Sequence, residues 1–225
     1  MLQEILSGNF HISDLIVHVL SCLVVIFGTM SVHEWAHGFV ATKLGDPTPR
    51  YQGRLTLNPF AHIDYVGALS MILLGVGWAK AVQVNPRNFK NPRVGMAITA
   101  FAGPAANIIT ATISMLFGYT VLVFGEPLGI FAVYARDFFV TIAFYNVYLA
   151  VFNFIPIPPF DGSRILFAIL PDRYYWKVMQ YERILMFVML IIIASRRLSA
   201  PISIAADAVF GVISYIASLP FRLFF

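Results

Sequence analysis

Long apolar stretches separated by short polar segments make up most of the sequence. Residues 14–44, 94–124 and 138–154 are apolar and long enough to cross a membrane as helices, because a span takes about 20 residues rising about 1.5 Å each. Residues 176–219 are predicted to form two further helices that meet near residues 196–201. The pattern therefore predicts about five membrane helices.

One further apolar stretch, residues 66–79, is too short to cross. As a helix it reaches only roughly 20 Å, against a hydrocarbon core of about 30 Å, so we expect a re-entrant segment. Beside it, residues 51–57 alternate with a period of about two, and residues 81–84 are short and bounded by turn-forming residues. Each of these two segments is predicted to be either a short membrane-associated β-strand or a plain loop.

Prolines mark the predicted helix boundaries in the middle of the chain. Gly103 and Pro104 interrupt the stretch 94–124, and we expect the helix to restart at Pro104, where a missing N–H costs little. Three prolines within residues 156–159 follow Phe154. They should end the preceding helix, because proline cannot continue it.

Composition agrees with this pattern. Apolar residues make up 59% of the 225 residues and charged residues only 12%, against about 45–50% and about 25% in soluble domains. Such a chain has too little polar surface for a water-soluble globule, and one Cys excludes a disulfide scaffold. We therefore predict an all-α polytopic membrane protein with about five membrane helices and one re-entrant segment, with short membrane-associated β-strands as the open alternative.

The positive charge sets an orientation and does not indicate nucleic-acid binding. The net charge is +4, but the basic residues cluster between apolar segments, and 12 of the 15 Lys and Arg lie in 43–93, 158–183 or at Arg222. Membrane proteins keep such residues mainly on the cytoplasmic side. These segments are therefore predicted to be cytoplasmic.

The sharpest motif is the pentapeptide HEWAH at residues 33–37. On a helix, residues four apart share a face, so His33 and His37 can bind one Zn²⁺ while Glu34 serves as the base for a water molecule. The alternative is two core histidines paired with neighbours. Ionisable residues at the end of a membrane span are costly and usually functional, which favours the metal interpretation.

A catalytic zinc site needs a third protein ligand. Asp161 stands out because it follows the prolines of residues 156–159 and precedes Gly162, which permits close backbone approach. Asp161 could also simply cap a helix that follows it. The side chains that could supply the third ligand are Asp46, His62, Asp64, Glu126, Asp137, Asp161 and Asp207.

Several motifs in the right order resemble one family. Residues 33–37, the GPAAN run at 103–107 and the Asn-to-Asp-Gly run at 153–162 resemble the site-2 protease family of intramembrane zinc metalloproteases. Residues 53–64 and 77–80 resemble its small bacterial branch without PDZ or CBS domains. That branch usually has Pro at positions 81 and 83, where this chain has Ala81 and Gln83. This difference leaves the shape of that loop open.

The resemblance implies one Zn²⁺ per chain, bound by His33, His37 and Asp161, with Glu34 as the catalytic base. It implies a multi-pass protein of the bacterial cytoplasmic membrane with its active site toward the cytoplasm. Residues 1–225 are then expected to form a single membrane-embedded metalloprotease domain. Its catalytic core would cover about residues 14–170, and a C-terminal helical hairpin about residues 175–220.

The topology can be tested against a shared zinc ion without the family. His33 lies roughly 27 Å of helix beyond Leu15, toward the cytoplasmic end of the first span. If residues 66–79 crossed fully, Asp161 would emerge about 30 Å away on the other face, whereas zinc ligands lie about 2 Å from the metal. Re-entry brings Asp161 to the level of His37, so re-entry is expected.

Amides in apolar surroundings are the remaining candidates. Asn107, Asn146 and Asn153 either join helices by hydrogen bonds or face the substrate. In the second case Asn107 or Asn153 would orient the substrate backbone or stabilise the oxyanion.

The sequence thus predicts a zinc endopeptidase that cleaves within or next to a transmembrane segment of another membrane protein, in the lipid bilayer. Residues 54–57 or 81–84 would hold the unwound substrate as a strand edge. The alternatives are an ion-coupled transporter that uses buried His, Asp and Asn, or an inactive protease relative that acts as a membrane chaperone. The oligomeric state stays open.

Overall fold

A computed structural model describes residues 12–64, 80–170, 180–195 and 197–222. These residues are mostly helical, and within these ranges no β-strand forms. The predicted class of all-α polytopic membrane protein is confirmed. The predicted re-entrant segment 66–79 lies outside the described residues. Four helices are long and apolar enough to cross a membrane: Ile12–Lys43, Pro92–Phe124, Ile130–Asn153 and Ser199–Phe221.

The first membrane helix has three parts. α2 (Ile12–Val24) continues through a π-helical turn, η1 (Val25–Thr29), into α3 (Met30–Lys43), which carries the HEWAH motif. In the π turn, the Thr29 hydroxyl donates to the Val25 carbonyl at 2.8 Å. π turns inside α-helices are frequent near functional sites, and this one immediately precedes α3.

α6 (Pro92–Phe124) runs through Pro104 without a break, so the predicted restart at Pro104 is wrong. The Asn91 side chain caps the start of α6, accepting from the Val94 N–H at 3.3 Å. Proline removes one helical hydrogen bond, but neighbouring helices support such residues in membrane proteins. Gly103, which precedes the proline, adds no side chain of its own to the crowding.

The chain turns back after α6 into α7 (Ile130–Asn153), which begins well before the predicted start at residue 138. Arg136 and Asp137 lie inside it and form an ion pair at 2.8 Å, so their charges do not end the helix. α8 (Asp161–Ile169), α10 (Glu182–Ala194) and α11 (Ser199–Ser218) follow. The predicted C-terminal helix pair is confirmed where described, with its break between α10 and α11.

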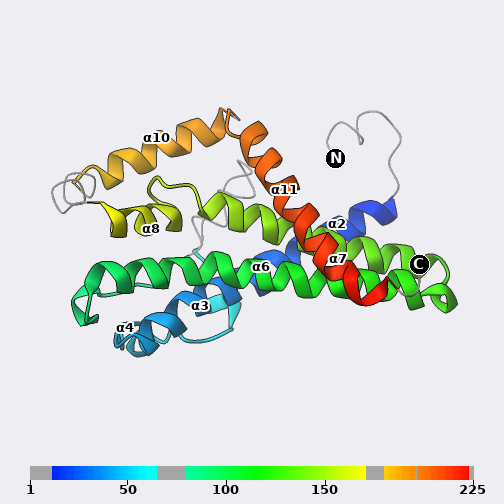
Figure 1. Cartoon of the computed structure of the whole chain (residues 1–225), viewed down its shortest axis with the longest axis horizontal. Coiled ribbons are helices and arrows are strands. Elements are labelled where there is room, and N and C mark those ends of the chain that lie inside the picture. Colours follow the sequence, from blue (N-terminus) through cyan, green and yellow to red (C-terminus); the bar gives the residue numbers. More distant parts are fainter. Residues whose placement is uncertain (1–11, 65–79, 171–179, 196, 223–225) are drawn as a thin grey trace.

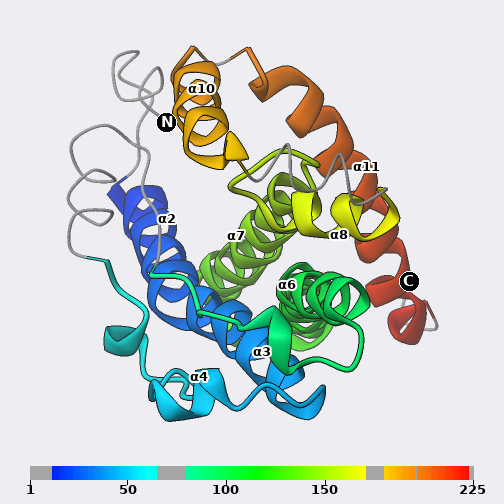
Figure 2. The same cartoon turned by 90° about the vertical axis from the view of Figure 1, so that its left-hand side faces the viewer.

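α6 is the central helix, and it contacts α3, α7, α8 and α11. Figures 1 and 2 show these helices arranged around it. Small residues allow the close packing of α6, α7 and α11. The buried cluster consists of Ala111, Met115, Ala143, Val147, Ala206, Ile213 and Ala217.

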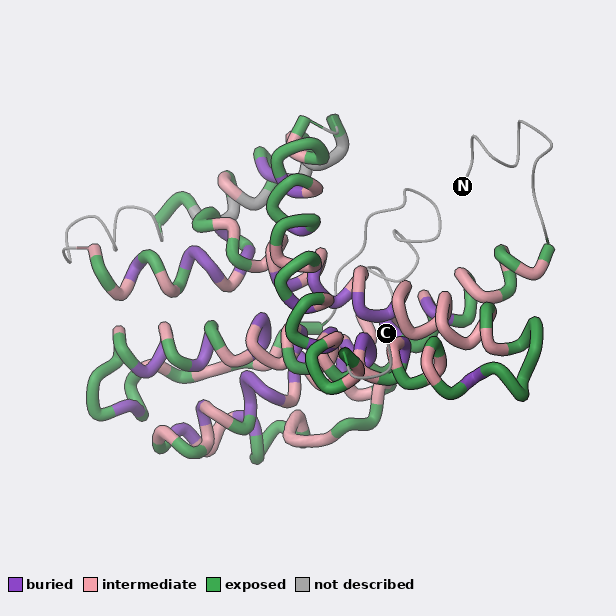
Figure 3. Tube along the Cα trace, turned by 45° about the vertical axis from the view of Figure 1, so that its right-hand side comes forward, coloured by how far each residue is buried: buried purple, intermediate pink, exposed green. Residues whose placement is uncertain are grey.

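The outer faces of these helices are apolar. Buried residues follow the helix contacts, while exposed ones face outward (Figure 3). Ile109, Phe131 and Ile204 are 60%, 72% and 70% exposed. In water such a surface would aggregate, whereas in a bilayer it contacts lipid chains, as expected of an integral membrane protein.

The two possible strands form no ladder, and the loop alternative is confirmed for both. α4 (Thr48–Tyr51) is followed by turns, with Gly53 at a φ of 65° in the left-handed region that favours glycine. That turn interrupts the period-two pattern of residues 51–57. Residues 80–85, called the 80–85 segment below, run as open chain up to the short helix η3 (Pro86–Asn88).

Candidate metal centre

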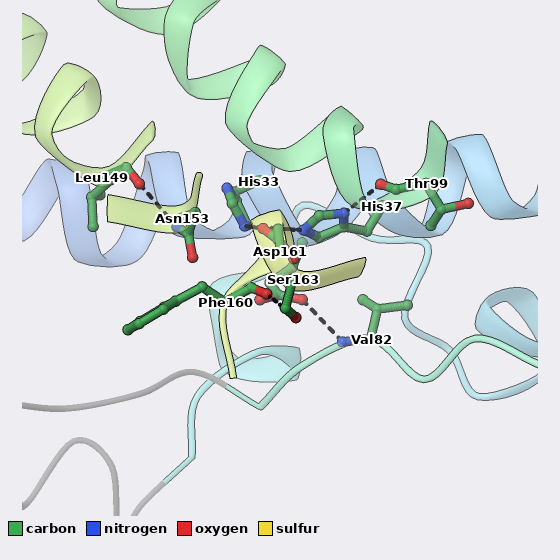
Figure 4. Close-up of polar contacts among 10 residues, drawn as sticks. His33, His37, Val82, Thr99, Leu149, Asn153, Phe160, Asp161 and Ser163 are labelled. Carbon is green, nitrogen blue, oxygen red and sulfur yellow. Dashed lines mark hydrogen bonds and ion pairs between the residues drawn. The ribbon is translucent and has the colours of Figure 1, made fainter. Parts of the chain in front are cut away.

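Two imidazoles from successive turns of α3 point into the protein beside α6. His33 and His37 share one face of α3, and their Nε2 atoms lie 3.0 Å apart. Both side chains are buried. Figure 4 shows the two rings on either side of Asp161. The HExxH spacing therefore produces the predicted convergent pair.

Asp161 approaches these imidazoles from a different helix, α8. It is the first residue of α8, and its Oδ2 lies 3.3 Å from Nε2 of His33 and 3.3 Å from Nε2 of His37. Phe160 occupies the cap position of α8, and no side chain caps the helix. Asp161 thus directs its carboxylate at the histidines and does not serve as the helix cap.

A tight turn places Asp161. A Cβ at Gly162 would collide with the backbone of Phe154 and Ile155, so only glycine permits this close approach. The Ser163 hydroxyl closes the turn by donating to the Phe160 carbonyl at 2.7 Å. The end of α7 and the start of α8 are thereby held together.

The donor set fits zinc. His37 donates from Nδ1 to the Thr99 carbonyl at 2.7 Å, which leaves the Nε2 lone pair free for a metal. Asp161 Oδ2 is buried and has no hydrogen-bond partner besides its 3.3 Å contacts with the two imidazoles, an arrangement that a bound ion would explain. The ligand atoms of His33, His37 and Asp161 lie within 4.8 Å of one another. Two imidazoles and one carboxylate are a ligand set of catalytic zinc sites.

Gly103 on α6 makes room for both rings. An ideal Cβ built there would lie 2.6 Å from Cε1 of His33 and closer still to His37. Any larger residue would push the imidazoles out of place. The close approach of α6 to α3 at the metal centre therefore depends on this glycine.

Glu34 points to a different neighbour. It is 7% exposed, and its Oε2 accepts a hydrogen bond from the Val82 backbone N–H at 2.9 Å. The 80–85 segment thus contacts the glutamate through the backbone of Val82. One carboxylate oxygen of Glu34 is oriented by this bond, and the other is left for a further partner.

The two predicted amides differ in their contacts. Asn107 lies one turn beyond Gly103 on α6, is 1% exposed and has a buried Nδ2 without a hydrogen-bond partner. Asn153, at the end of α7, donates from Nδ2 to the Leu149 carbonyl at 3.0 Å, and Figure 4 shows it beside the metal centre.

The other acidic and histidine candidates do not join the centre. Asp46 accepts hydrogen bonds from Thr48, Asn85 and Asn88. His62 contacts the Thr56 carbonyl at 2.9 Å, and Asp137 pairs with Arg136. Across the described ranges, His33, His37 and Asp161 form the group of three that could hold a metal ion.

Sequence reasoning missed two contributors to the centre. The Thr99 carbonyl orients His37, and the Val82 N–H orients Glu34. Both are backbone groups, which every residue carries, so no residue type marks them. Only the packing of distant segments identifies them.

Comparisons with known proteins agree with this geometry. Residues 21–196 match the model of peptidase family M50. "Putative zinc metalloprotease YwhC" of Bacillus subtilis is 37% identical over 161 residues, covering 71% of this chain and 74% of the relative. No solved structure matches the chain significantly.

More distant relatives carry similar names. "Putative zinc metalloprotease Rip2" of Mycolicibacterium smegmatis is 30% identical over 61% of this chain and 52% of its own length. "Zinc metalloprotease MJ0392" of Methanocaldococcus jannaschii is 26% identical over 67% of this chain and 34% of its own length. The chain thus spans about half of the mycobacterial relative and about a third of the archaeal one.

Proposed function

Because the chain belongs to peptidase family M50 and is a zinc metalloendopeptidase of the membrane, we propose that it cleaves a peptide bond within or next to a transmembrane segment of another membrane protein. The observation that carries this proposal is the convergence of two imidazoles and a carboxylate in a chain with four membrane-length helices. Membership of a peptidase family argues against the transporter alternative. The presence of Glu34 argues against an inactive relative.

In this proposal His33, His37 and Asp161 hold the zinc ion. All three donor atoms face one point, and the Thr99 carbonyl holds His37 in the tautomer that binds metal. When bound, Zn²⁺ polarises the scissile carbonyl and lowers the pKa of water toward about 7.

Glu34 acts as general base and then as general acid. It takes the proton of the attacking water and passes it to the leaving amine. The Val82 N–H occupies Oε2 of Glu34 and so fixes the carboxylate, leaving its other oxygen for the water. Glu34 can face this segment while His33 faces the metal site, because consecutive helix residues point in directions about 100° apart.

Amide donors complete the site. Asn107 has a buried Nδ2 without a partner on the face of α6 that contacts the histidines, which is what an oxyanion donor awaiting its substrate requires. Asn153 uses one of its two amide hydrogens on Leu149 and keeps the other for substrate. These two residues orient the substrate backbone and stabilise the negative charge on its carbonyl oxygen.

The 80–85 segment is the better of the two predicted substrate edges. A helical substrate hides its carbonyls in hydrogen bonds and must unwind before attack, after which an extended backbone can pair with exposed main-chain groups. Val82 already lies on Glu34, so a substrate beside this segment lies beside the base. In the other predicted edge, residues 54–57, Arg54 donates to the Ala61 carbonyl.

The site opens to the cytoplasm of a bacterium in this proposal. Most Lys and Arg residues lie in the segments that flank the HEWAH end of the first helix and the start of α8, and such residues concentrate on the cytoplasmic side.

The test compares membrane-protein fragments from cells that carry the wild-type chain with cells that carry Glu34→Gln. Glutamine keeps the shape but cannot accept a proton, so cleavage should fall by about 10²–10⁴-fold while zinc stays bound. A photo-crosslinking residue in place of Gln83, introduced into Glu34→Gln, should capture the uncleaved substrate.

The matched control places the crosslinker at Ile204, an exposed position on α11. Identical fragments in the two strains would contradict the proposed activity. Capture at residue 204 alone would contradict the proposed substrate edge.

A further inference from the structure

Asp46 is a fully buried carboxylate outside the metal centre, and it has a fixed place relative to the HEWAH helix. α3 ends in a Schellman motif, in which the Asp46 N–H donates to Ala41 at 2.9 Å and the Gly45 N–H to Thr42 at 3.2 Å. Gly45 has a φ of 109°, which favours glycine. The aspartate is therefore rigidly attached to the end of α3.

Its carboxylate joins two segments that are far apart in the sequence. Oδ1 accepts from the Thr48 N–H at 3.1 Å and from Asn88 Nδ2 at 2.7 Å. Oδ2 accepts from the Asn85 N–H at 2.7 Å. Asp46 itself is 0% exposed, so water does not compete for these bonds.

The bonds outweigh the cost of burying a charge. Burial alone raises the pKa of Asp46, but the hydrogen bonds from Thr48, Asn88 and Asn85 hold this pKa below its usual value. The carboxylate is thus ionised near neutral pH, and charge-assisted hydrogen bonds of this kind are the strong ones. Asp46 is consequently a firm anchor for the residues it contacts.

The anchored residues adjoin the contact with the base. Asn85 is three residues beyond Val82, whose N–H donates to Glu34. A Cβ at Gly38 would lie 3.6 Å from Val82 and 3.3 Å from Pro49, so the 80–85 segment also packs on the same helix. Two hydrogen bonds therefore tie the 80–85 segment to α3 and the turn that follows it: Asn85 to Asp46, and Val82 to Glu34.

We propose that Asp46 is a positioning residue of the protease: it holds the 80–85 segment against α3 so that the Val82 N–H stays on Glu34. This inference rests on the proposed role of Glu34 as base. Without the anchor, the segment keeps its chain connections but loses its fixed height above the carboxylate. Glu34 then samples orientations that do not reach the water, and a misplacement of about 1 Å can cost about 10²-fold in rate.

The experiment uses the full chain in detergent with three variants. In Asp46→Asn the amide NH₂ must face either the Asn85 N–H or the donors on Thr48 and Asn88, so at least one hydrogen bond is lost. Adding Asn88→Asp exchanges donor and acceptor and restores the bond between the two side chains. Asn58→Ala is the matched control, because Asn58 caps η2 (Pro59–Ala61), a turn of the same loop region, and does not contact Asp46.

Two measurements are made on each variant. Cleavage of fluorescein-labelled casein, an unfolded protein, gives kcat and KM. Spin labels in place of Gln52 and Gln83 report the position of the segment, since these exposed side chains meet at 3.0 Å between Nε2 and Oε1. Cys22, the single cysteine, is first replaced by Ser in every protein.

Asp46→Asn should lower kcat by about 10- to 100-fold with a smaller change in KM, broaden the distribution of distances between the labels and leave zinc content unchanged. The double variant restores the bond between residues 46 and 88 but leaves the Thr48 N–H without its acceptor, so it should recover part of kcat and narrow the distribution. Asn58→Ala should match wild type.

Unchanged label distances in Asp46→Asn would overturn the inference whatever the enzyme cleaves. So would a rise in KM alone, or failure of the double variant to recover kcat. If the wild-type protein cleaves neither casein nor a membrane protein, the proposed function is contradicted. The distances between the labels then still test whether Asp46 holds the 80–85 segment in place.

Discussion

On one turn of α3, the adjacent residues His33 and Glu34 point to different neighbours. His33 faces α6 and Asp161, whereas Glu34 faces the 80–85 segment. The proposed ligand His33 and the proposed base Glu34 therefore depend on different neighbours, although they are consecutive in the chain. Substitutions at the two kinds of position should be separable by experiment.

Asp161→Asn should lose zinc and cleavage together. A neutral amide is a poor zinc ligand, which leaves two good donors. Since even the residues that support zinc ligands are worth about 10–100-fold in affinity, we expect a loss of at least about 100-fold, measured by competition with a chromophoric chelator. Asp64→Asn is the control and should keep its zinc. Zinc retained in Asp161→Asn but lost in Asp64→Asn would mean that the third ligand is misassigned.

At the scale of elements, α6 forms one wall of the metal centre. Its Thr99 carbonyl holds His37, Gly103 admits both rings and Asn107 follows one turn later. All three lie at four-residue intervals and so on one helix face. The helix remains continuous at Pro104, which keeps this face in register.

Gly103→Ala should impair the metal centre more than the fold. The new Cβ would overlap the His37 ring and lie 2.6 Å from His33 Cε1, so the imidazoles must move by a substantial fraction of an ångström. We expect cleavage to fall by about 10²-fold and zinc affinity to fall with it, while the helical circular dichroism is unchanged.

The matched control is Gly118→Ala on the same helix. There the nearest atom to the new Cβ is Val140 Cγ2 at 3.3 Å, in the contact with α7, so packing tightens without touching a ligand. Equal loss of zinc in the two variants would show that the effect of Gly103→Ala comes from general helix packing.

At the scale of the whole molecule, the membrane orientation follows from the position of the metal centre along the helices. The HEWAH end of the first helix and the start of α8 meet at the same level. The turn that holds Glu126 connects the end of α6 to the start of α7, and both lie far from the metal centre. The two ends of this bundle should therefore face opposite sides of the membrane.

Single cysteines test this arrangement in a Cys22→Ser background. Cysteines at Gln52 and Arg87, both exposed, should react with a membrane-impermeant maleimide only when the cytoplasmic face is open to the reagent. A cysteine at Glu126 should react in intact cells. Labelling of residues 52 and 87 from opposite faces would refute the prediction that the chain between them is re-entrant.

Some features of this protein follow from the sequence because their physics is local. Apolar length determines the membrane helices, and the HExxH spacing determines that His33 and His37 share a face. Asp161 was recognisable as a candidate from its prolines and Gly162, but six other side chains remained possible. Local signals failed at Pro104 and at the start of α7, where packing and the Arg136–Asp137 pair override them.

Tertiary structure alone decided which groups complete the site. Asp161 is separated from the histidines by two membrane helices, and its distance of 3.3 Å to both imidazoles depends on how α8 packs on α6. The Thr99 carbonyl and the Val82 N–H are backbone groups, which the sequence does not distinguish from any others. Helix periodicity links residues within a few positions, whereas contacts between distant segments are set by packing. In this protein packing brings Asp161 to the histidines, fixes the tautomer of His37 and orients Glu34.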